Sequence, residues 1–174
     1  MKGMIEIYTG DGKGKTTAAL GLALRAAGAG LRVYILQFLK SAGSSEYEAV
    51  KGIENIRMET VEESVKFVFM MNEAEKAKNR ENNIRKFREA AGLIYGNAAD
   101  VVIFDEIIGC MKIGQLPEEE VLELLGNKPE NVEIVLTGRD ADEELIRLAD
   151  YVTEVRKIKH PYDKGEEARK GIEY

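Results

Sequence analysis

Apolar positions along the chain fall into two kinds of run that alternate. Short apolar runs predict strands over residues 4–8, 32–38, 56–59, 100–106, 133–137 and 151–158. Apolar residues at helical spacing predict helices over residues 15–27, 71–98 and 142–148 and another that starts at Pro117, while residues 41–45 form a loop. This alternation predicts a single α/β domain over residues 1–174, with a parallel sheet covered by helices on both faces.

The most distinctive segment lies directly after the first predicted strand. It comprises Thr9, Gly10, Asp11, Gly12, Lys13, Gly14, Lys15, Thr16 and Thr17. Glycines allow successive backbone N–H groups to point at one anion, and the start of the following helix attracts negative charge. Lys15 adds a mobile positive charge, and the Thr16 hydroxyl is placed to bind magnesium. The segment therefore predicts nucleotide polyphosphate binding on a P-loop NTPase-like fold, rather than a glycine-rich and lysine-rich surface turn without a ligand.

The usual pattern of such loops is not matched in full, because Thr9 stands where the first glycine is expected. Gly10 and Gly12 still supply the flexibility that the turn requires. The position of the loop between a predicted strand and a predicted helix is the context that supports a phosphate site.

A pair of carboxylates forms the second chemical feature. Asp105 and Glu106 follow an apolar run at the predicted carboxyl end of a strand, where parallel sheets collect ligands. One carboxylate is expected to hold Mg²⁺ or its water shell and the other to orient a reactant; the alternative is that these acids cap a helix. A hydrolase would use Glu106 to activate water, and a kinase would need a site for an acceptor hydroxyl. These motifs do not decide between the two.

Composition narrows the classes of function. The 174 residues carry a formal net charge of −6 with no basic block, which argues against nonspecific nucleic-acid binding. One cysteine, Cys110, excludes an internal disulfide and fits a reducing cytoplasm. No apolar run approaches the roughly 20 residues that span a bilayer, and no signal-peptide pattern precedes the first strand. We therefore expect a cytoplasmic protein whose partners include neither nucleic acid nor membrane.

Five motifs together resemble one family. They occupy residues 8–19, 37–40, 101–106, 136–139, and the ending 159–160 with 171–174. In this order, over nearly the whole chain, the sequence is similar to the P-loop type of ATP:cob(I)alamin adenosyltransferase, also called corrinoid adenosyltransferase. The resemblance implies transfer of the 5′-deoxyadenosyl group of ATP to the cobalt(I) of cobalamin or another corrinoid, with release of triphosphate, in synthesis or salvage of adenosylcobalamin. Cobalt(I) is then the nucleophile, so the protein needs none of its own.

The resemblance also implies roles for the loop and the carboxylate pair. The loop would enclose the triphosphate, with Lys13 and Lys15 offsetting the charge that grows as the carbon–oxygen bond breaks. Lys15, Lys13 and Glu106 are the expected catalytic residues. Thr16 and Glu106, together with Asp105, would hold Mg²⁺, and the whole loop would bind ATP.

Two arginines and the single histidine have counterparts in the family. Arg25, on the first predicted helix, stands where members have an arginine near the nucleotide, and a solvated helix arginine is the equal alternative. Arg139, just past a strand, is a candidate contact to the ligand or a residue that stabilises a turn. His160 is expected to be structural.

Phe67 and Phe69 resemble an aromatic pair that packs below the corrinoid and keeps a lower ligand off the cobalt, which makes cobalt(II) easier to reduce. In some relatives the second position is a tryptophan. The alternative is that both phenylalanines belong to the core, because their alternation suits a strand.

The resemblance further implies a cytoplasmic homodimer that receives electrons from a flavoprotein reductase. Some members carry an extra N-terminal helix that covers the corrinoid site, whereas this sequence starts at its first strand. Two rival functions stay open. One is a small-molecule kinase or ATPase on the same fold, and the other is an ATP-gated binding module without turnover.

Overall fold

A six-stranded parallel sheet with strand order β3-β2-β4-β5-β1-β6 forms the centre of the protein. The computed structural model describes residues 2–41, 45–62 and 68–172. Its strands are β1 (Ile5–Thr9), β2 (Val33–Ser41), β3 (Ile56–Glu62), β4 (Val101–Asp105), β5 (Glu133–Thr137) and β6 (Tyr151–Glu154). The predicted α/β fold with a parallel sheet is confirmed.

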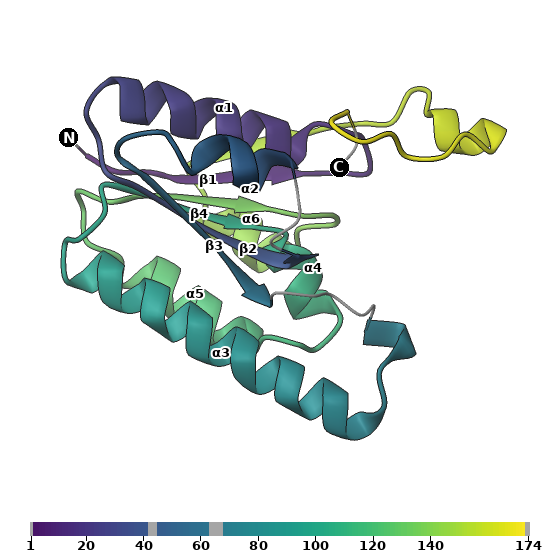
Figure 1. Cartoon of the computed structure of the whole chain (residues 1–174). Coiled ribbons are helices and arrows are strands. Elements are labelled where there is room, and N and C mark those ends of the chain that lie inside the picture. Colours follow the sequence, from purple (N-terminus) through teal and green to yellow (C-terminus); the bar gives the residue numbers. More distant parts are fainter. Residues whose placement is uncertain (1, 42–44, 63–67, 173–174) are drawn as a thin grey trace.

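Helices cover both faces of this sheet, as predicted (Figure 1). They are α1 (Lys15–Gly28), α2 (Ser45–Val50), α3 (Glu73–Tyr95), α4 (Ile107–Lys112), α5 (Glu118–Gly126) and α6 (Glu143–Leu148), with 3-10 turns η1 (Val68–Met70) and η2 (Pro161–Lys164). Along β2, Val33 and Ile35 pack with α1 and α2, whereas Leu36 and Phe38 pack with α3 to α6. Successive strand residues point to opposite faces, so two hydrophobic cores form, one on each side of the sheet.

Several element boundaries differ from those predicted. The helices α2 and α4, each of six residues, were not predicted, whereas α6, which is equally short, was predicted. The last strand ends at Glu154 rather than at residue 158. The long helix starts after Asn72, whose side-chain oxygen accepts from the N–H of Glu75 at 2.9 Å, and Pro117 precedes its helix as the N-cap.

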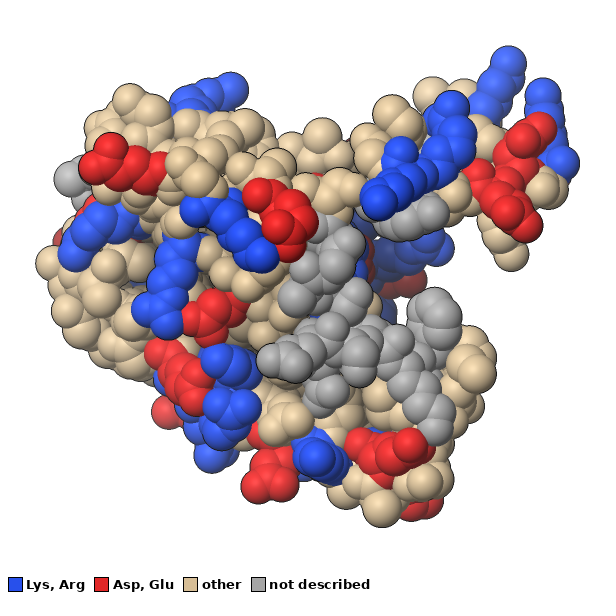
Figure 2. Space-filling model, viewed as in Figure 1, with Lys and Arg blue, Asp and Glu red and all other residues tan. Residues whose placement is uncertain are grey.

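The chain after β6 projects beyond the carboxyl ends of the strands and carries η2 (Figure 1). The space-filling surface is hollowed beneath this projecting segment (Figure 2). The loop between β1 and α1 and the ends of β2, β4 and β5 lie at the same edge of the sheet, because all of these strands are parallel. The fold therefore gathers the glycine loop and the Asp105–Glu106 pair at one edge.

Candidate nucleotide-binding site

The glycine loop is shaped by close contact with the segment that follows β6. The N–H of Gly12 donates to the carbonyl oxygen of Val155 at 2.7 Å, and the N–H of Val155 donates to that of Thr9 at 2.8 Å. A Cβ atom on Gly10, where φ is +104°, would lie 2.4 Å from the Val155 oxygen, and one on Gly12 would lie 2.8 Å from it. Both positions therefore require glycine.

Lys15, the first residue of α1, is folded back onto this loop. Its Nζ donates to the carbonyl oxygens of Gly10 at 2.7 Å and Gly12 at 2.9 Å, and the residue is 7% exposed. Burial lowers the pKa of Lys15, although the nearby Glu106 carboxylate opposes this effect. The ammonium is thus held by neutral carbonyl groups that phosphate oxygens could replace.

Asp105 is the centre of the hydrogen-bond network at the site and is 2% exposed. Its Oδ1 accepts from the hydroxyls of Thr16 at 2.8 Å and Thr137 at 2.7 Å. Its Oδ2 accepts from the Gln37 amide at 2.8 Å and lies 3.4 Å from the Lys40 ammonium. This carboxylate therefore joins the loop to the ends of β2 and β5.

Glu106 follows β4 in a left-handed conformation, with φ of 61°, and stands at the N-cap of α4. Its N–H donates to the Thr137 hydroxyl at 2.8 Å. Burial raises the pKa of Glu106, with the adjacent Asp105 carboxylate acting in the same direction. Its side chain makes no cap hydrogen bond, so the alternative that this acid serves to cap the helix has no support at Glu106.

These residues surround a cavity of about 320 Å³. The predicted residues that line it are Asp11, Gly12, Lys13, Gly14, Lys15, Thr16, Thr17, Glu106 and Arg139. The other lining residues are Lys40, Glu46, His160, Ala168 and Ile172, so the segment after β6 forms part of the wall. The cavity has the size of a small-ligand site and mixes cations, carboxylates and loop backbone.

The structure does not bring Arg25 to this cavity. Arg25 is exposed in the last turn of α1, about ten residues and roughly 15 Å along the helix from Lys15. It lines a separate hollow at the amino ends of the strands, with Glu6 and Tyr151 among its neighbours. Within the chain, Arg25 therefore lies away from the glycine loop, and its contact with the nucleotide stays a prediction.

The structure describes only the second of the two phenylalanines. Phe67 lies outside the described residues, and Phe69 lies in η1 with 81% of its surface exposed. The alternative that Phe69 belongs to the core is therefore wrong. Cys110, by contrast, is a buried free thiol whose pKa is raised by burial to about 12.

Sequence reasoning assigned no role to several residues of the site. Gln37, Lys40 and Thr137 fall in motifs that supported the family resemblance, but no role was assigned to them. His160 lines the cavity and also accepts the N–H of Tyr162 on its Nδ1 at 3.2 Å, which fits the structural role expected of it. The signal for Lys40 and Thr137 was their position at strand ends, beside the loop.

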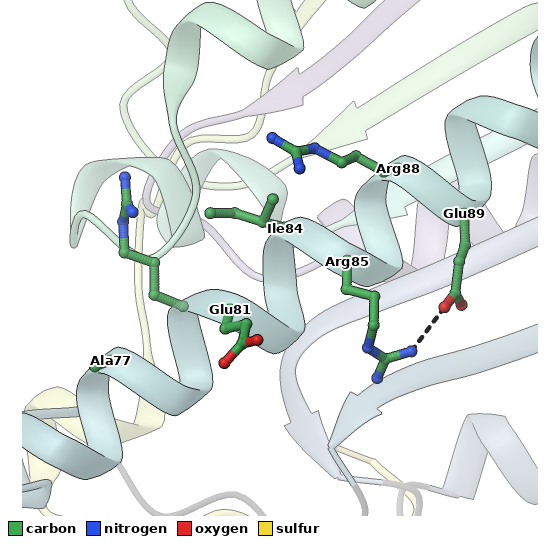
Figure 3. Close-up of a pocket in the computed structure, with 7 residues that line it drawn as sticks. Ala77, Glu81, Ile84, Arg85, Arg88 and Glu89 are labelled. Atoms are coloured by element: carbon green, nitrogen blue, oxygen red, sulfur yellow. Dashed lines mark hydrogen bonds and ion pairs between the residues drawn. The ribbon is translucent and has the colours of Figure 1, made fainter.

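A larger hollow, of about 830 Å³, lies along α3 (Figure 3). Its lining residues are Ala77, Arg80, Glu81, Ile84, Arg85, Arg88 and Glu89. Arg85 and Glu89 pair at 2.7 Å, and Arg88 pairs with Glu120 at 2.8 Å. All of the lining comes from one exposed helix, so this hollow has the character of a charged surface groove rather than of a reaction site.

No helix among the described residues is long and apolar enough to cross a membrane.

Residues 1–174 match the family of ATP:corrinoid adenosyltransferases BtuR/CobO/CobP. The corrinoid adenosyltransferase of Escherichia coli K12 is 32% identical over 173 residues, which cover 99% of this chain and 86% of that protein. The enzyme CobA of Salmonella typhimurium LT2 is 31% identical with the same coverage.

Solved structures confirm the fold. A KaiC-like protein from Pyrococcus horikoshii OT3 superposes with a TM-score of 0.53 at 16% identity, covering 89% of this chain and 73% of that one. At this identity the likeness shows the P-loop NTPase-like architecture alone. The full-length family match and the curated relatives establish more, namely that the chain belongs to the ATP:corrinoid adenosyltransferase family.

Proposed function

We propose that this chain binds ATP in the cavity at the glycine loop and transfers its 5′-deoxyadenosyl group to the cobalt(I) of a corrinoid, with release of triphosphate. ATP and a corrinoid as substrates follow from the family. The observation that carries the proposal for the site is that Lys15, Thr16 and Glu106 line one cavity, where the Thr16 hydroxyl donates to the buried Asp105 carboxylate. No rival kinase or ATPase activity is favoured by the relatives.

For this reaction the protein must position the reactants and supply charge, and it does not need to supply a nucleophile. Cobalt(I) donates an electron pair to C5′, the cobalt–carbon bond forms, and the C5′–oxygen bond breaks with its electrons passing to the triphosphate. The site must hold cobalt and C5′ in line and stabilise the leaving group. A cavity lined by Lys13, Lys15, Lys40 and Arg139 provides positive charge for a departing polyphosphate.

Lys15 is the group that we assign to the leaving triphosphate. In the structure its ammonium is held by two carbonyl oxygens, which are weaker partners than phosphate oxygens. Binding of ATP would exchange these carbonyls for phosphate. Lys13 and the backbone N–H groups of Gly14 and Thr16 would complete the cradle.

The residues present fit a magnesium ion. Thr16 and Asp105 offer oxygen atoms, which Mg²⁺ prefers, and Glu106 lines the same cavity. The Gln37 Oε1, in the amide that donates to Asp105, is buried without a partner among the described residues, and a water molecule would satisfy it. No set of three or more His, Cys, Asp or Glu residues gathers to hold a metal in residues 2–41, 45–62 and 68–172, and phosphate oxygens and water would supply the other ligands.

When bound, Mg²⁺ would neutralise charge on the triphosphate as the C5′–oxygen bond breaks. Thr16 would stay anchored to Asp105, and Asp105 would stay anchored to Thr137 and Gln37, so that the oxygen ligands keep their places. Glu106, with its raised pKa, is the nearby carboxylate that a metal ion would return to the charged form.

Product analysis tests the proposal. The protein is incubated with ATP, Mg²⁺ and chemically reduced cobalamin, and the expected products are adenosylcobalamin and triphosphate. Release of ADP and phosphate would instead establish a kinase or ATPase. Tight ATP binding without any product over hours would point to a non-catalytic binding module.

Phe69 provides a test of the corrinoid side of the site. Because this side chain is exposed in η1, Phe69→Ala should leave the melting temperature unchanged. We expect it to spare the reaction of pre-reduced cobalt(I) and to slow the route from cobalt(II) about threefold to tenfold, the size of one lost aromatic contact. Both routes are followed by the absorbance of adenosylcobalamin, and equal losses in the two would contradict this role.

We also propose, from the family resemblance, that the protein works as a cytoplasmic homodimer supplied with electrons by a flavoprotein reductase. Sedimentation of the purified chain tests the first part, since a monomer at all concentrations would contradict it. Turnover from cobalt(II) with a reduced flavoprotein as the only electron source tests the second part.

A further inference from the structure

Lys40 occupies the space between the two residues to which we assign the metal. Its Nζ lies 3.3 Å from the Thr16 hydroxyl oxygen and 3.4 Å from Asp105 Oδ2. The side chain is 32% exposed and lines the cavity. An ammonium group is therefore placed where a cation bound to Thr16 and Asp105 would lie.

A backbone irregularity brings Lys40 to this place. Phe38 packs on the face of the sheet that carries α3 to α6, and regular alternation would send Leu39 to the opposite face and Lys40 away from the loop. Leu39 instead packs on the same face as Phe38, and Lys40 reaches Thr16 on the face of α1. The β-bulge therefore exchanges the faces of these two residues.

The bulge has an energetic cost. Leu39 has φ of +56°, a left-handed conformation that is unfavourable for a residue with a side chain. The pairing of β2 with β3 shifts register between Gln37 and Ser41. Strain of this kind next to a ligand cavity points to function.

We propose that Lys40 is a positioning residue that takes the place of the divalent cation while no nucleotide is bound, and so restricts the metal to entry together with ATP. The inference rests on the magnesium site of the proposed function and deepens it. The Thr16 oxygen now accepts from Lys40 while its hydroxyl donates to Asp105, so a metal must displace the ammonium. Without a new partner the two positive charges would repel each other.

ATP supplies that partner. The cavity that Lys40 lines is the one assigned to the triphosphate, so the ammonium can move from Asp105 to a phosphate oxygen without leaving the cavity. The metal then enters the vacated position with the phosphates as further ligands. Lys40 thereby changes from an occupant of the metal position into a contact of the nucleotide.

Lys40→Met separates this role from folding. The variant keeps a long side chain, and Asp105 retains its hydrogen bonds from Thr16, Thr137 and Gln37. Lys40→Arg is the matched control because it preserves the positive charge. Binding of Mn²⁺ is measured without nucleotide, from the loss of the electron paramagnetic resonance signal of the free ion.

We expect Lys40→Met to bind Mn²⁺ alone at least about tenfold more tightly than the wild type and Lys40→Arg, because removal of one nearby positive charge favours a divalent cation. Asp105→Asn in the Lys40→Met background should abolish the gain, which would place the ion at this site. Equal Mn²⁺ affinity in the three proteins, or a gain that survives Asp105→Asn, would overturn the inference.

A second titration distinguishes this failure from failure of the magnesium site itself. Wild type and Asp105→Asn are titrated with Mn²⁺ in the presence of saturating ATP. Tighter Mn²⁺ binding by the wild-type complex supports the magnesium site, whatever Lys40 does. If the two complexes bind the ion equally, the magnesium site and the inference that rests on it both fail.

Discussion

The two ends of the parallel sheet both carry carboxylates that accept hydrogen bonds, but these carboxylates bind different kinds of partner. At the amino ends, the N–H groups of Met4, Ile5 and Arg32 donate to Glu133 at 2.7 Å, Asp150 at 2.9 Å and Asp100 at 2.8 Å. At the carboxyl ends, the donors to Asp105 among the described residues are side chains, namely two hydroxyls, one amide and one ammonium. The carboxylates at the amino ends thus bind backbone N–H groups, whereas Asp105 at the carboxyl ends binds side chains that can move.

This difference separates hydrogen bonds that stabilise the fold from hydrogen bonds that a ligand can replace. A backbone N–H at the start of a strand has a fixed position, so replacing its carboxylate partner leaves a donor without a bond and weakens the fold. A hydroxyl rotates and a lysine side chain moves, so a ligand can take over their bonds without unfolding the chain. Binding chemistry therefore belongs to the carboxyl ends, where the partners of Asp105 can change.

Two lysines, one buried and one half-buried, extend the comparison to cations. Lys15 donates to the carbonyl oxygens of Gly10 and Gly12, and Lys128 donates to those of Gly3 at 2.7 Å and Val132 at 2.9 Å. Burial lowers the pKa of both ammonium groups. Lys15 lines the cavity, whereas Lys128 ties the first residues of the chain to the start of β5.

The pair of variants Lys15→Ala and Lys128→Ala gives the largest expected effect. Lys15→Ala should slow adenosyl transfer by about 10²–10³-fold, as expected when one preorganised charge-stabilising group is lost. Lys128→Ala should leave the rate unchanged and lower the free energy of unfolding by about 1–3 kcal/mol, because buried carbonyls lose their donor. Rates are measured with chemically reduced cobalt(I), and stability by denaturant unfolding.

A near-normal rate for Lys15→Ala would refute its role at the triphosphate. A loss of rate in Lys128→Ala as large as that in Lys15→Ala would contradict the comparison. Residues at the amino ends of the strands would then affect the reaction as much as residues at the carboxyl ends do. Lys15→Arg keeps the charge but changes the shape of the donor. Partial recovery of the rate in Lys15→Arg would show how much of the effect is charge alone.

The sequence predicted the central sheet well for a physical reason. The strands β4 and β5 are buried on both faces and read as continuous apolar runs, and the glycine loop carries its chemistry in consecutive residues. Asp105 follows one such run directly. Buried strands, which read as apolar runs, and a loop whose chemistry lies in consecutive residues could therefore be predicted without a structure.

Features that depend on distant contacts were not visible. Regular alternation along the strand predicts the wrong face for Lys40. The bulge at Leu39 involves contacts that are distant in sequence, namely with Gly109 of α4 and with β3, where the register shifts. The bonds between Val155 and the glycine loop join segments far apart in sequence. Arg25 was expected near the nucleotide from resemblance, but the rise of α1 carries it toward the other end of the sheet.

Asp100 tests the structural role of the carboxylates at the amino ends, with an expected effect on stability of intermediate size. Its carboxylate accepts from the Arg32 backbone and from Nε at 3.0 Å and Nη2 at 2.7 Å, and these bonds lower its pKa to about 2. The folded state thus favours the ionised acid. The stabilisation is full above the unfolded pKa of about 3.9 and is lost as the pH falls toward about 2.

Asp100→Asn should therefore lower the melting temperature by about 4 °C at pH 7 and by much less near pH 2. Thermal unfolding followed by circular dichroism over this range measures the gap. Glu48→Gln serves as the control, since Glu48 pairs with Lys51 on the exposed surface of α2. A gap for Asp100→Asn that does not close at low pH would show that the lost packing, rather than the charge, causes the effect.

Glu133 gives the smallest effect, with the opposite dependence on pH. Burial raises the pKa of this acid to about 7, and the neighbouring Glu6 adds to the shift. The folded state thus favours the neutral form, so the contribution to stability is present below the unfolded pKa of about 4.3 and is lost as the pH rises past 7. A permanently neutral side chain should escape this loss.

Glu133→Gln keeps an oxygen that can accept the N–H of Met4 and cannot ionise. We expect its melting temperature to exceed that of the wild type by about 2 °C at pH 8 and to equal it near pH 4.5, with adenosyl transfer unchanged. The same substitution at the carboxyl end, Glu106→Gln, should reduce the rate, because that acid lines the cavity. If both glutamines altered stability alone, the carboxyl end would be as purely structural as the amino end, and the assignment of Glu106 to the metal would be wrong.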